Sequence, residues 1–290
     1  MPSILDIRRR IRSVRNTQQI TRAMKMVAGA KLSRAQDRAV RTRPYVRQTS
    51  SVLSSLAARV ENPDHPLLER REVRQVLLVL LTADKGLCGA FNSNLIRAAQ
   101  HYLEEHKDLE VSMITIGRRG SDFFRKRDVP KVAEWIGLFG RLKFTDAEEI
   151  TSKIISLYTD GTFDAVDLLY NEFKTVLTQK LVVERFLPIE PIAPPHGAGE
   201  AGDSPLVDYI YEQPPGEIFG RLLPRYVEIE VYRALIESEA AELASRMTAM
   251  DAATKNAGEM IDQLTLNMNR IRQAAITREI IEIVSGAAAL

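Results

Sequence analysis

The sequence predicts a mixed α/β protein, in which long N- and C-terminal helices pair as an antiparallel coiled coil and a central α/β domain separates them along the chain. No proline occurs between Pro2 and Pro44 or after Pro224, and apolar residues recur every three or four positions in both segments. Between these segments, strand-like runs alternate with helical ones. A helix over the 66 residues after Pro224 would be roughly 100 Å long, and its apolar stripe requires a partner helix.

The N-terminal helix is expected within residues 1–60. Ser3 and Asp6 form a capping-box pattern at its start, Pro44 is expected to kink it, and Pro63 and Pro66 are expected to end it. Its seam has the 3-4 spacing of a left-handed coiled coil, although the middle of the seam is polar or small. The predicted seam positions are Ile4, Ile7, Ile11, Val14, Gln18, Thr21, Lys25, Ala28, Leu32, Ala35 and Ala39.

The central domain is expected within residues 70–190. Buried strands are predicted at 73–82, 111–117, 165–173 and 181–189, and helices at 90–106, 121–127 and 145–159. Strands that alternate with helices are typical of a Rossmann-like domain with a parallel-type sheet. Residues 191–215 follow as a separate segment, whose Pro- and Gly-rich part at 193–204 predicts a mobile loop.

The C-terminal helix is expected within residues 216–290. Small residues such as Ala253 and Gly258 would let a partner helix approach closely. The apolar pattern changes phase near its end, which is expected to change the supercoil locally. The seam positions are Leu243, Met247, Met250, Thr254, Ala257, Ile261, Leu264, Met268 and Ile271, and after the change of phase Ile276, Ile280, Ile283 and Ala287.

The composition is that of an ordinary globular protein. The chain is 45% hydrophobic and 27% charged with a net charge of +2, which argues against disorder and gives no sign of a nucleic-acid partner. Cys88 is the only cysteine, so an intramolecular disulfide and a Cys-rich metal site are excluded. No apolar run approaches the ~20 residues that a membrane span needs. The Arg-rich N-terminus is similar to a transit peptide in composition, but its apolar periodicity continues into the helix, and we interpret it as structure.

Positive charge is concentrated in the N-terminal helix. The first 47 residues hold thirteen basic residues and two acidic ones, whereas the two kinds balance from Leu243 to the end. Three interpretations remain open: a solvated coiled-coil face, a nucleic-acid arm, or a helix that faces acidic protein surfaces. The nucleic-acid arm is disfavoured because no aromatic residue that could stack on a base occurs before Tyr45.

Residues 84–92, with the sequence DKGLCGAFN, lie where a predicted strand gives way to a helix. Sites in α/β proteins often lie at such places, so a structural turn and a contact site both remain open. The spacings of a phosphate loop and of a dinucleotide fingerprint are absent from the chain. A nucleophilic Cys88 is disfavoured because no histidine forms a motif with it, and His101 and His106 lack the four-residue spacing of a helical metal pair. No catalytic set and no cofactor site are predicted.

Three segments together strongly resemble the gamma subunit of F-type ATP synthase. Residues 4–47, which include NTQQITRAMKMVA from Asn16 to Ala28, resemble the N-terminal helix of that family. Residues 84–92 resemble its central motif, and RQAAITREIIEIVSGAAA from Arg272 to Ala289 resembles its C-terminal signature. The three matches occur in the family's order and span nearly the full chain.

The resemblance implies a central rotor shaft that is not itself catalytic. Such a shaft couples ion-driven rotation of the c-ring to conformational change and ATP synthesis or hydrolysis on a ring of three alpha and three beta subunits. The epsilon subunit and the c-ring are implied as further partners, with no cofactor in this chain, no nucleic acid, and membrane association only through the complex. The basic N-terminal helix suits an acidic loop that the family's beta subunits turn toward the shaft.

The resemblance also implies individual contacts. The apolar tip at residues 280–290 would enter an apolar sleeve at the top of the ring, and a foot segment within 191–215 would meet the c-ring loops. Contacts with the beta ring are implied for Met24, Lys85, Arg246, Arg272, Gln273, Thr277 and Glu279, and contacts of the foot for Tyr209 and Glu212.

Plant-type gamma chains carry an inserted cysteine pair for thiol control, which a single cysteine excludes. The resemblance therefore implies a peripheral protein on the cytoplasmic face of a bacterial plasma membrane. Two rival hypotheses remain: a coiled-coil interaction protein of another kind, such as an arm for nucleic acid, and an α/β enzyme with its site at residues 84–92. Neither explains why the recognisable segments are concentrated in the two terminal helices.

Overall fold

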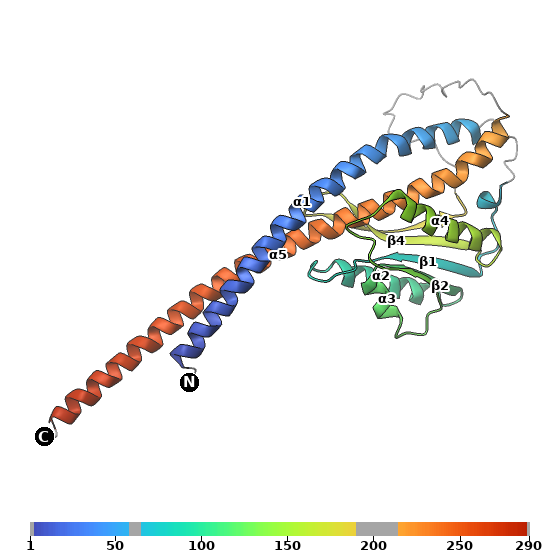
Figure 1. Cartoon of the computed structure of the whole chain (residues 1–290). Coiled ribbons are helices and arrows are strands. Elements are labelled where there is room, and N and C mark those ends of the chain that lie inside the picture. The colour runs from blue at the N-terminus through green and yellow to red at the C-terminus, as the bar shows by residue number, and fades with distance from the viewer. Residues whose placement is uncertain (1–2, 58–64, 190–213, 289–290) are drawn as a thin grey trace, which may run out of the picture. The chain divides into compact units, whose positions relative to one another are not determined.

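The computed structural model describes residues 3–57, 65–189 and 214–288. The chain forms two compact units, which we describe separately: a two-helix unit of Met1–Gly29 and Arg246–Leu290, and a sheet unit of Ala30–Ser245. Helices α1 (Ile4–Ala57) and α5 (Pro215–Ala288) contribute to both (Figure 1). Tyr209, Glu212 and nearly all of the predicted segment at 191–215 lie outside the described residues. Within the described ranges, no helix is both long and apolar enough to span a membrane.

In the two-helix unit, α1 and α5 pack antiparallel along the predicted seams. Thr21 Oγ1 lies 2.8 Å from Thr254 Oγ1, and Lys25 Nζ lies 2.5 Å from Asp251 Oδ1. The residue numbers rise along α1 while those of the partners fall along α5, so the two helices run in opposite directions. The predicted seam positions of α1 in this unit are all buried or half-buried. The 3-4 spacing therefore identified the packed face of α1 correctly.

The start of α1 has the predicted capping box. Ser3 Oγ accepts a hydrogen bond from the Asp6 backbone N–H at 3.2 Å, and Asp6 Oδ2 accepts one from the Ser3 backbone N–H at 3.3 Å. The Ser3 hydroxyl also donates to Asp6 Oδ2 at 2.7 Å. These bonds satisfy backbone donors that a helix leaves unpaired at its start.

Both long helices contain an internal proline. α1 continues through Pro44 to Ala57, and α5 continues through Pro224 after starting at Pro215. The proline-free segment therefore underestimates the length of α5, which has 74 residues. Pro215 is the first residue of the helix, where the missing N–H would have no partner in any case.

The sheet unit contains a five-stranded sheet in the order β3-β2-β1-β4-β5. Its first four strands in that order are parallel, and Val79 of β1 is paired with Ile114 on one side and Leu168 on the other. The strands are β1 (Gln75–Leu81), β2 (Glu110–Ile116), β3 (Lys131–Trp135), β4 (Ala165–Phe173) and β5 (Gln179–Leu187), and the shorter helices are α2 (Phe91–Glu105), α3 (Arg118–Phe124) and α4 (Phe144–Thr159). The predicted Rossmann-like α/β class is confirmed.

Three details of the sheet unit differ from the prediction. β5 is antiparallel to β4 because the connection at residues 174–178 is far shorter than the dozen or so residues that a parallel crossover needs. β3 was not predicted, since it is short and its Lys131 and Glu134 are exposed at the sheet edge. α3 begins at Arg118 rather than at residue 121.

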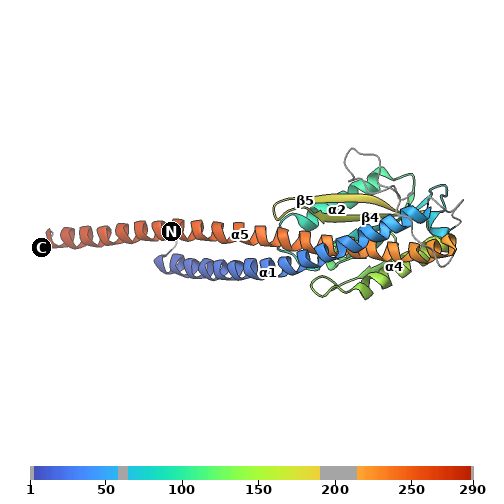
Figure 2. The same ribbon diagram turned by 90° about the horizontal axis from the view of Figure 1, so that it is seen from above.

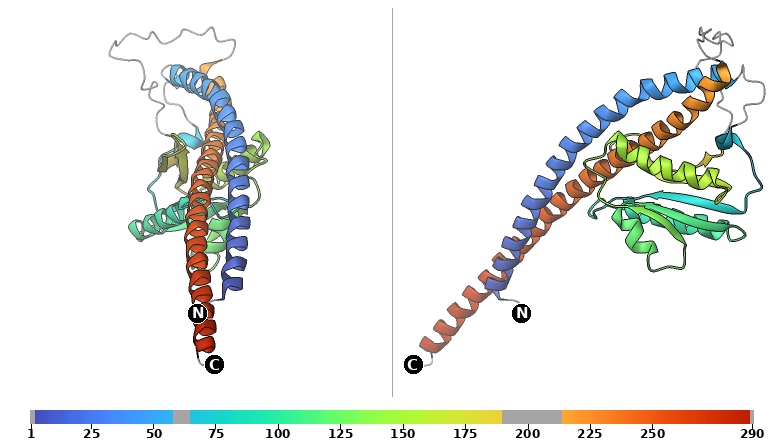
Figure 3. Two further views of the ribbon diagram at one scale, coloured as in Figure 1. Left: turned by 90° about the vertical axis from the view of Figure 1, so that its left-hand side faces the viewer. Right: turned by 45° about the vertical axis from the view of Figure 1, so that its right-hand side comes forward.

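Both faces of the sheet are covered. Leu77, Val79 and Leu81 of β1 belong to a cluster with residues of α1, α4 and α5, and the residues between them belong to a cluster with α2 and α3. Figure 3 shows α4 on one side of the sheet and α2 and α3 on the other. This double cover explains why β1 is a continuous apolar run instead of an alternating one.

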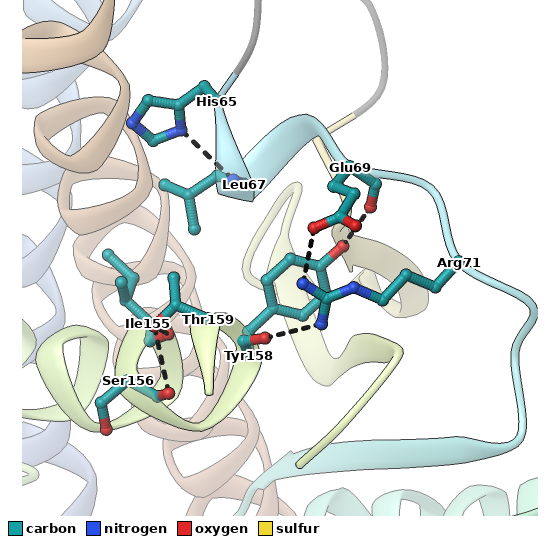
Figure 4. Close-up of polar contacts among 8 residues, drawn as sticks. All are labelled: His65, Leu67, Glu69, Arg71, Ile155, Ser156, Tyr158 and Thr159. Atoms are coloured by element: carbon teal, nitrogen blue, oxygen red, sulfur yellow. Dashed lines mark hydrogen bonds and ion pairs between the residues drawn. The ribbon is translucent and has the colours of Figure 1, made fainter. Parts of the chain in front are cut away.

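The connection from η1 (Pro66–Leu68) to β1 is tied to the end of α4 (Figure 4). The Tyr158 hydroxyl donates to the Glu69 carbonyl at 2.7 Å, and Arg71 donates to the Tyr158 carbonyl at 3.0 Å and to the Glu69 carboxylate at 2.6 Å. Burial raises the pKa of Tyr158, which keeps its hydroxyl protonated as a donor. These bonds hold the segment that precedes the central strand.

In the sheet unit, α1 and α5 are joined by a partly buried ion pair. Arg38 Nη2 lies 2.8 Å from Glu239 Oε2, and the Glu239 side chain is 3% exposed. Glu239 Oε1 also accepts a hydrogen bond from the Gly140 backbone N–H at 2.9 Å. Glu239 therefore links α5 to α1 and to the loop before α4.

We expect Glu239→Ala to destabilise the chain by about 1–3 kcal/mol, because the Gly140 N–H loses its acceptor and Arg38 keeps only the Leu142 carbonyl. Urea unfolding followed by circular dichroism would measure the change. Arg34→Ala, which removes an exposed arginine from the same helix, is the matched control and should change stability by less than about 0.5 kcal/mol. Equal losses for the two variants would contradict the role of the pair.

Candidate functional site

The middle of the two-helix unit combines polar contacts between the helices with the buried side chain of Met250. Thr21 and Thr254 meet through their hydroxyls, and Gln18 Nε2 donates to the Thr254 carbonyl at 3.4 Å. The hydrogen bond from Lys25 lowers the pKa of Asp251, so this ion pair persists at neutral pH. The polar seam that the sequence showed thus consists of matched pairs across the two helices.

Two predicted contact residues lie in this part of the unit. Met24 of α1 and Arg246 of α5 are each half-buried, so part of each side chain faces solvent. Both helices are regular here, and they therefore hold these side chains on a rigid surface.

α5 extends past the start of α1 (Figure 2). Because Thr21 lies opposite Thr254 in an antiparallel pair, Ile4 at the start of α1 comes opposite Ile271. Ile271 is half-buried, whereas residues 272–285 are exposed, with the exception of Ala275. Among the described residues, the end of α5 therefore has no helix beside it.

This uncovered end carries both apolar and polar side chains. Five large apolar residues are between 48% and 71% exposed: Ile276, Ile280, Ile281, Ile283 and Val284. The four predicted contact residues Arg272, Gln273, Thr277 and Glu279 are also exposed and lie on the same stretch of helix. A contiguous exposed apolar surface with polar residues beside it is typical of a protein–protein contact site.

Lys85 belongs to the sheet unit, in the turn between β1 and α2. The Asn92 side chain closes this turn: its Oδ1 accepts from the Ala83 N–H at 2.9 Å and its Nδ2 donates to the Lys85 carbonyl at 3.3 Å. Asp84 Oδ1 accepts from the backbone N–H groups of Arg118 and Gly137, at 3.1 and 2.8 Å. The turn is therefore bonded to the start of α3, which follows β2, and to the loop that follows β3, at the carboxyl edge of the sheet.

Leu87 has an unusual conformation for its position in this turn. Its φ is +63°, a region that costs a non-glycine residue roughly 1–2 kcal/mol, and its side chain is 65% exposed. Gly89, with a φ of +56°, adopts the same region without that cost. If the turn had only a structural role, glycine or asparagine at position 87 would adopt this conformation at a lower free energy than leucine. The geometry therefore favours the contact-site interpretation over the purely structural one.

Cys88 does not reach the surface of the turn. The residue is 2% exposed, its Sγ lies 3.1 Å from Asn92 Nδ2, and its carbonyl accepts from the Ser245 hydroxyl at 2.8 Å. These surroundings are those of a structural cysteine packed into the interior. Within the described ranges, no three His, Cys, Asp or Glu side chains are grouped to hold a metal ion.

A family profile described as ATP synthase matches residues 3–290. Over 293 residues the chain is 55% identical to the ATP synthase gamma chain of Solibacter usitatus, which covers all of this chain and 99% of the relative. It is 48% identical over 300 residues to the ATP synthase gamma chain of Chloroherpeton thalassium, with the same coverage.

The chain belongs to the ATP synthase gamma chain family.

Solved structures of that family's assemblies share the fold. A chain of the Euglena gracilis mitochondrial ATP synthase rotor in rotational state 1 matches with a TM-score of 0.66 at 21% identity, covering 94% of this chain and 98% of that one. A chain of the Euglena gracilis OSCP/F1/c-ring structure in rotational state 3 matches with a TM-score of 0.68 at 18% identity, covering 99% of this chain and 94% of that one. The predicted resemblance to gamma subunits is confirmed.

The structure adds the contacts of three polar residues of this gamma chain that the sequence could not pair. Asp251 and Thr254 pair with Lys25 and Thr21 across the two helices, and Asn92 closes the β1–α2 turn. Thr254 was predicted as a seam position and Asn92 lay in the segment at residues 84–92, whereas Asp251 was not singled out. The partners of Thr254 and Asp251 were not visible in the sequence, because Thr21 and Lys25 lie 233 and 226 residues away and meet them only through the tertiary packing.

We expect Asn92→Ala to destabilise the gamma chain by about 1–3 kcal/mol, because the Ala83 N–H at the end of the buried strand loses its acceptor. Urea unfolding would measure this loss. Ser93→Ala, at the next and exposed position of α2, is the control and should be close to neutral. A neutral Asn92→Ala would show that its amide does not hold the turn.

Proposed function

We propose that this gamma chain is the central rotor shaft of an F-type ATP synthase. In this role it couples ion-driven rotation of the c-ring to conformational change, and so to ATP synthesis or hydrolysis, in a ring of three alpha and three beta subunits. The chain itself is not catalytic. The observation that carries the proposal is the uncovered end of α5, where exposed isoleucines and polar side chains form one helical surface beyond the start of α1.

The geometry supports a shaft because the surface is carried by long regular helices. An isolated helix with this many exposed apolar residues is marginal in water, whereas an apolar sleeve in a partner would bury them and stabilise it. The end of α5 is also asymmetric, since a single helix has different side chains on each side. An asymmetric shaft can hold three otherwise equal subunits in three different states, which is rigid-body switching.

Individual contacts with the beta ring follow from the exposed polar groups. Arg272 offers a guanidinium donor and Gln273 an amide donor, with Thr277 about one turn and Glu279 about two turns further along the exposed helix. Met24 and Arg246 offer partly exposed side chains on the helix pair, and Lys85 offers an exposed ammonium group on the rigid turn. We assign all seven residues to contacts with the beta subunits.

Tyr209 and Glu212 are proposed to contact the c-ring loops, and the epsilon subunit is proposed as a further partner in the rotor.

The relatives that bear on the location of this chain are bacterial gamma chains. We therefore place this chain on the cytoplasmic face of a bacterial plasma membrane, where it is bound to the membrane only through the complex.

The test of the proposed function is reconstitution with alpha and beta subunits from the same source. The gamma chain alone should show no ATPase activity. Together, the subunits should form a 3:3:1 complex with rotation-dependent ATP hydrolysis, which a fluorescent probe on the gamma chain would report. A folded gamma chain that fails to join the ring would contradict the proposal. That result would favour the rival hypothesis of a coiled-coil interaction protein of another kind.

We expect the double variant Arg272→Ala, Gln273→Ala to lower the coupled ATPase activity of the reconstituted complex by about tenfold, since each lost contact with a partner costs roughly 1 kcal/mol or more. The exposed positions predict unchanged stability of the isolated chain, which circular dichroism would check. Full coupled activity would remove these two residues from the ring contacts. The matched control is Arg125→Ala, an exposed arginine of the sheet unit.

We expect Leu87→Asn to leave the isolated chain as stable as before or more so, because asparagine tolerates a positive φ better than leucine. It should nevertheless weaken binding to the alpha–beta ring, because it removes an exposed apolar side chain from the contact surface. Native mass spectrometry across a range of ring concentrations would measure the affinity. Leu177→Asn removes another exposed leucine of the sheet unit and should leave the affinity unchanged; equal binding by all three chains would rule out a contact at Leu87.

A further inference from the structure

A groove of about 470 Å³ lies along α2 in the sheet unit. One wall is the exposed side of α2, with Asn94, Arg97 and His101 at successive turns of the helix. The opposite wall comes from the β4–β5 hairpin, with Asn171, Gln179 and Leu181, and Ser245 of α5 also lines it. This volume is within the range of about 300–1,000 Å³ that is typical of binding sites.

The groove is elongated. Its lining on α2 runs from Ala90 to His101, which at 1.5 Å per residue spans roughly 17 Å. An open channel of that length beside a helix fits a segment of polypeptide better than a compact small molecule. Its apolar lining by Phe91, Ala98 and Leu181 would contact the apolar side chains of such a segment.

The polar groups of the groove favour a negatively charged occupant. In the part of the chain that the structure describes, Arg97 forms no ion pair, whereas His101 lies 3.3 Å from Glu105. Asn171 is only 5% exposed as a residue and lines the groove, so its side-chain amide can meet an occupant there. A hydrogen bond between this amide and an occupant would orient the occupant in the groove and add to its affinity.

The groove is continuous with the β1–α2 turn. Ala90 and Phe91 belong both to the lining and to the turn segment, and Ser245, which also lines the groove, donates its hydroxyl hydrogen bond to the Cys88 carbonyl at 2.8 Å. Lys85 and Leu87 are exposed on this turn. A protein that contacts the turn could therefore also contact the groove.

We propose that the α2 groove binds an acidic segment of the same ring subunit that contacts the β1–α2 turn, with a carboxylate paired to Arg97 and a polar group hydrogen-bonded to Asn171. This inference rests on the proposed function, and it adds Arg97, Asn94 and Asn171 to the residues that contact the ring. A charge-assisted bond to Arg97 would be stronger than a neutral one and would weaken as salt screens it.

The first experiment measures how the full gamma chain binds the alpha–beta ring at low and at moderate salt. Arg97→Glu should weaken binding about tenfold or more at low salt, because like charges would then face each other, with a smaller effect at moderate salt. Lys107→Glu makes the same charge change at an exposed residue just beyond α2 and outside the groove, and it should bind like the wild type.

The second experiment identifies the occupant directly. A photo-crosslinking amino acid is placed at Asn94, which is exposed and lines the groove, and the assembled complex is irradiated and analysed by mass spectrometry. The expected product joins α2 to an acidic segment of a ring subunit, and Arg97→Glu should reduce its yield. The same amino acid at Lys107 should not give this product.

The outcomes separate this inference from the proposed function. A wild-type chain that does not join the ring overturns both. If the wild type and Arg97→Glu join the ring equally well, only the groove proposal fails. A crosslink to a subunit outside the ring, a crosslink to a segment without net negative charge, or no crosslink from Asn94 also overturns it.

Discussion

The structure depends on burial of the apolar stripe along α5. A helix of 74 residues has far more apolar surface than it could expose, and water alone would not keep it helical. In the two-helix unit Met250 and Ala257 of α5 are buried beside α1, and in the sheet unit the stripe packs against α1 and one face of the sheet. The orientation of α5 in each unit is set by this burial, and it determines which side chains remain outside.

The seam between α1 and α5 is not uniform. At its middle, hydrogen bonds and an ion pair lie beside the buried Met250, and small residues bring the helices close: a Cβ on Gly29 would lie 3.3 Å from Met247 Sδ. Polar seam residues lower the stability of a coiled coil but specify how its helices align. This alignment places Ile4 opposite Ile271 and so determines where the uncovered part of α5 begins.

The carboxyl edge of the sheet is rigid for a different reason. There the backbone passes so close to a neighbouring strand that a Cβ at Gly117 would lie 1.9 Å from the Thr82 carbonyl oxygen. Asp84 and Asn92 then bond the β1–α2 turn to neighbouring loops and to its own backbone. The exposed side chains of Lys85 and Leu87 are therefore presented from a fixed support, although Leu87 itself has a costly conformation.

The sequence by itself determined the elements whose period is clear. The 3-4 spacing identified the packed face of α1, and the apolar run of β1 identified a strand buried on both faces, because side-chain period follows directly from helix and strand geometry. The segments at residues 16–28, 84–92 and 272–289 were also sufficient to predict the family. Only the tertiary structure decided that β5 is antiparallel, that α1 packs against α5 only as far as Ile271, and that Asn171 and Arg97 line one groove. Periodicity shows that a face needs cover, but what covers it depends on contacts between residues far apart in the chain.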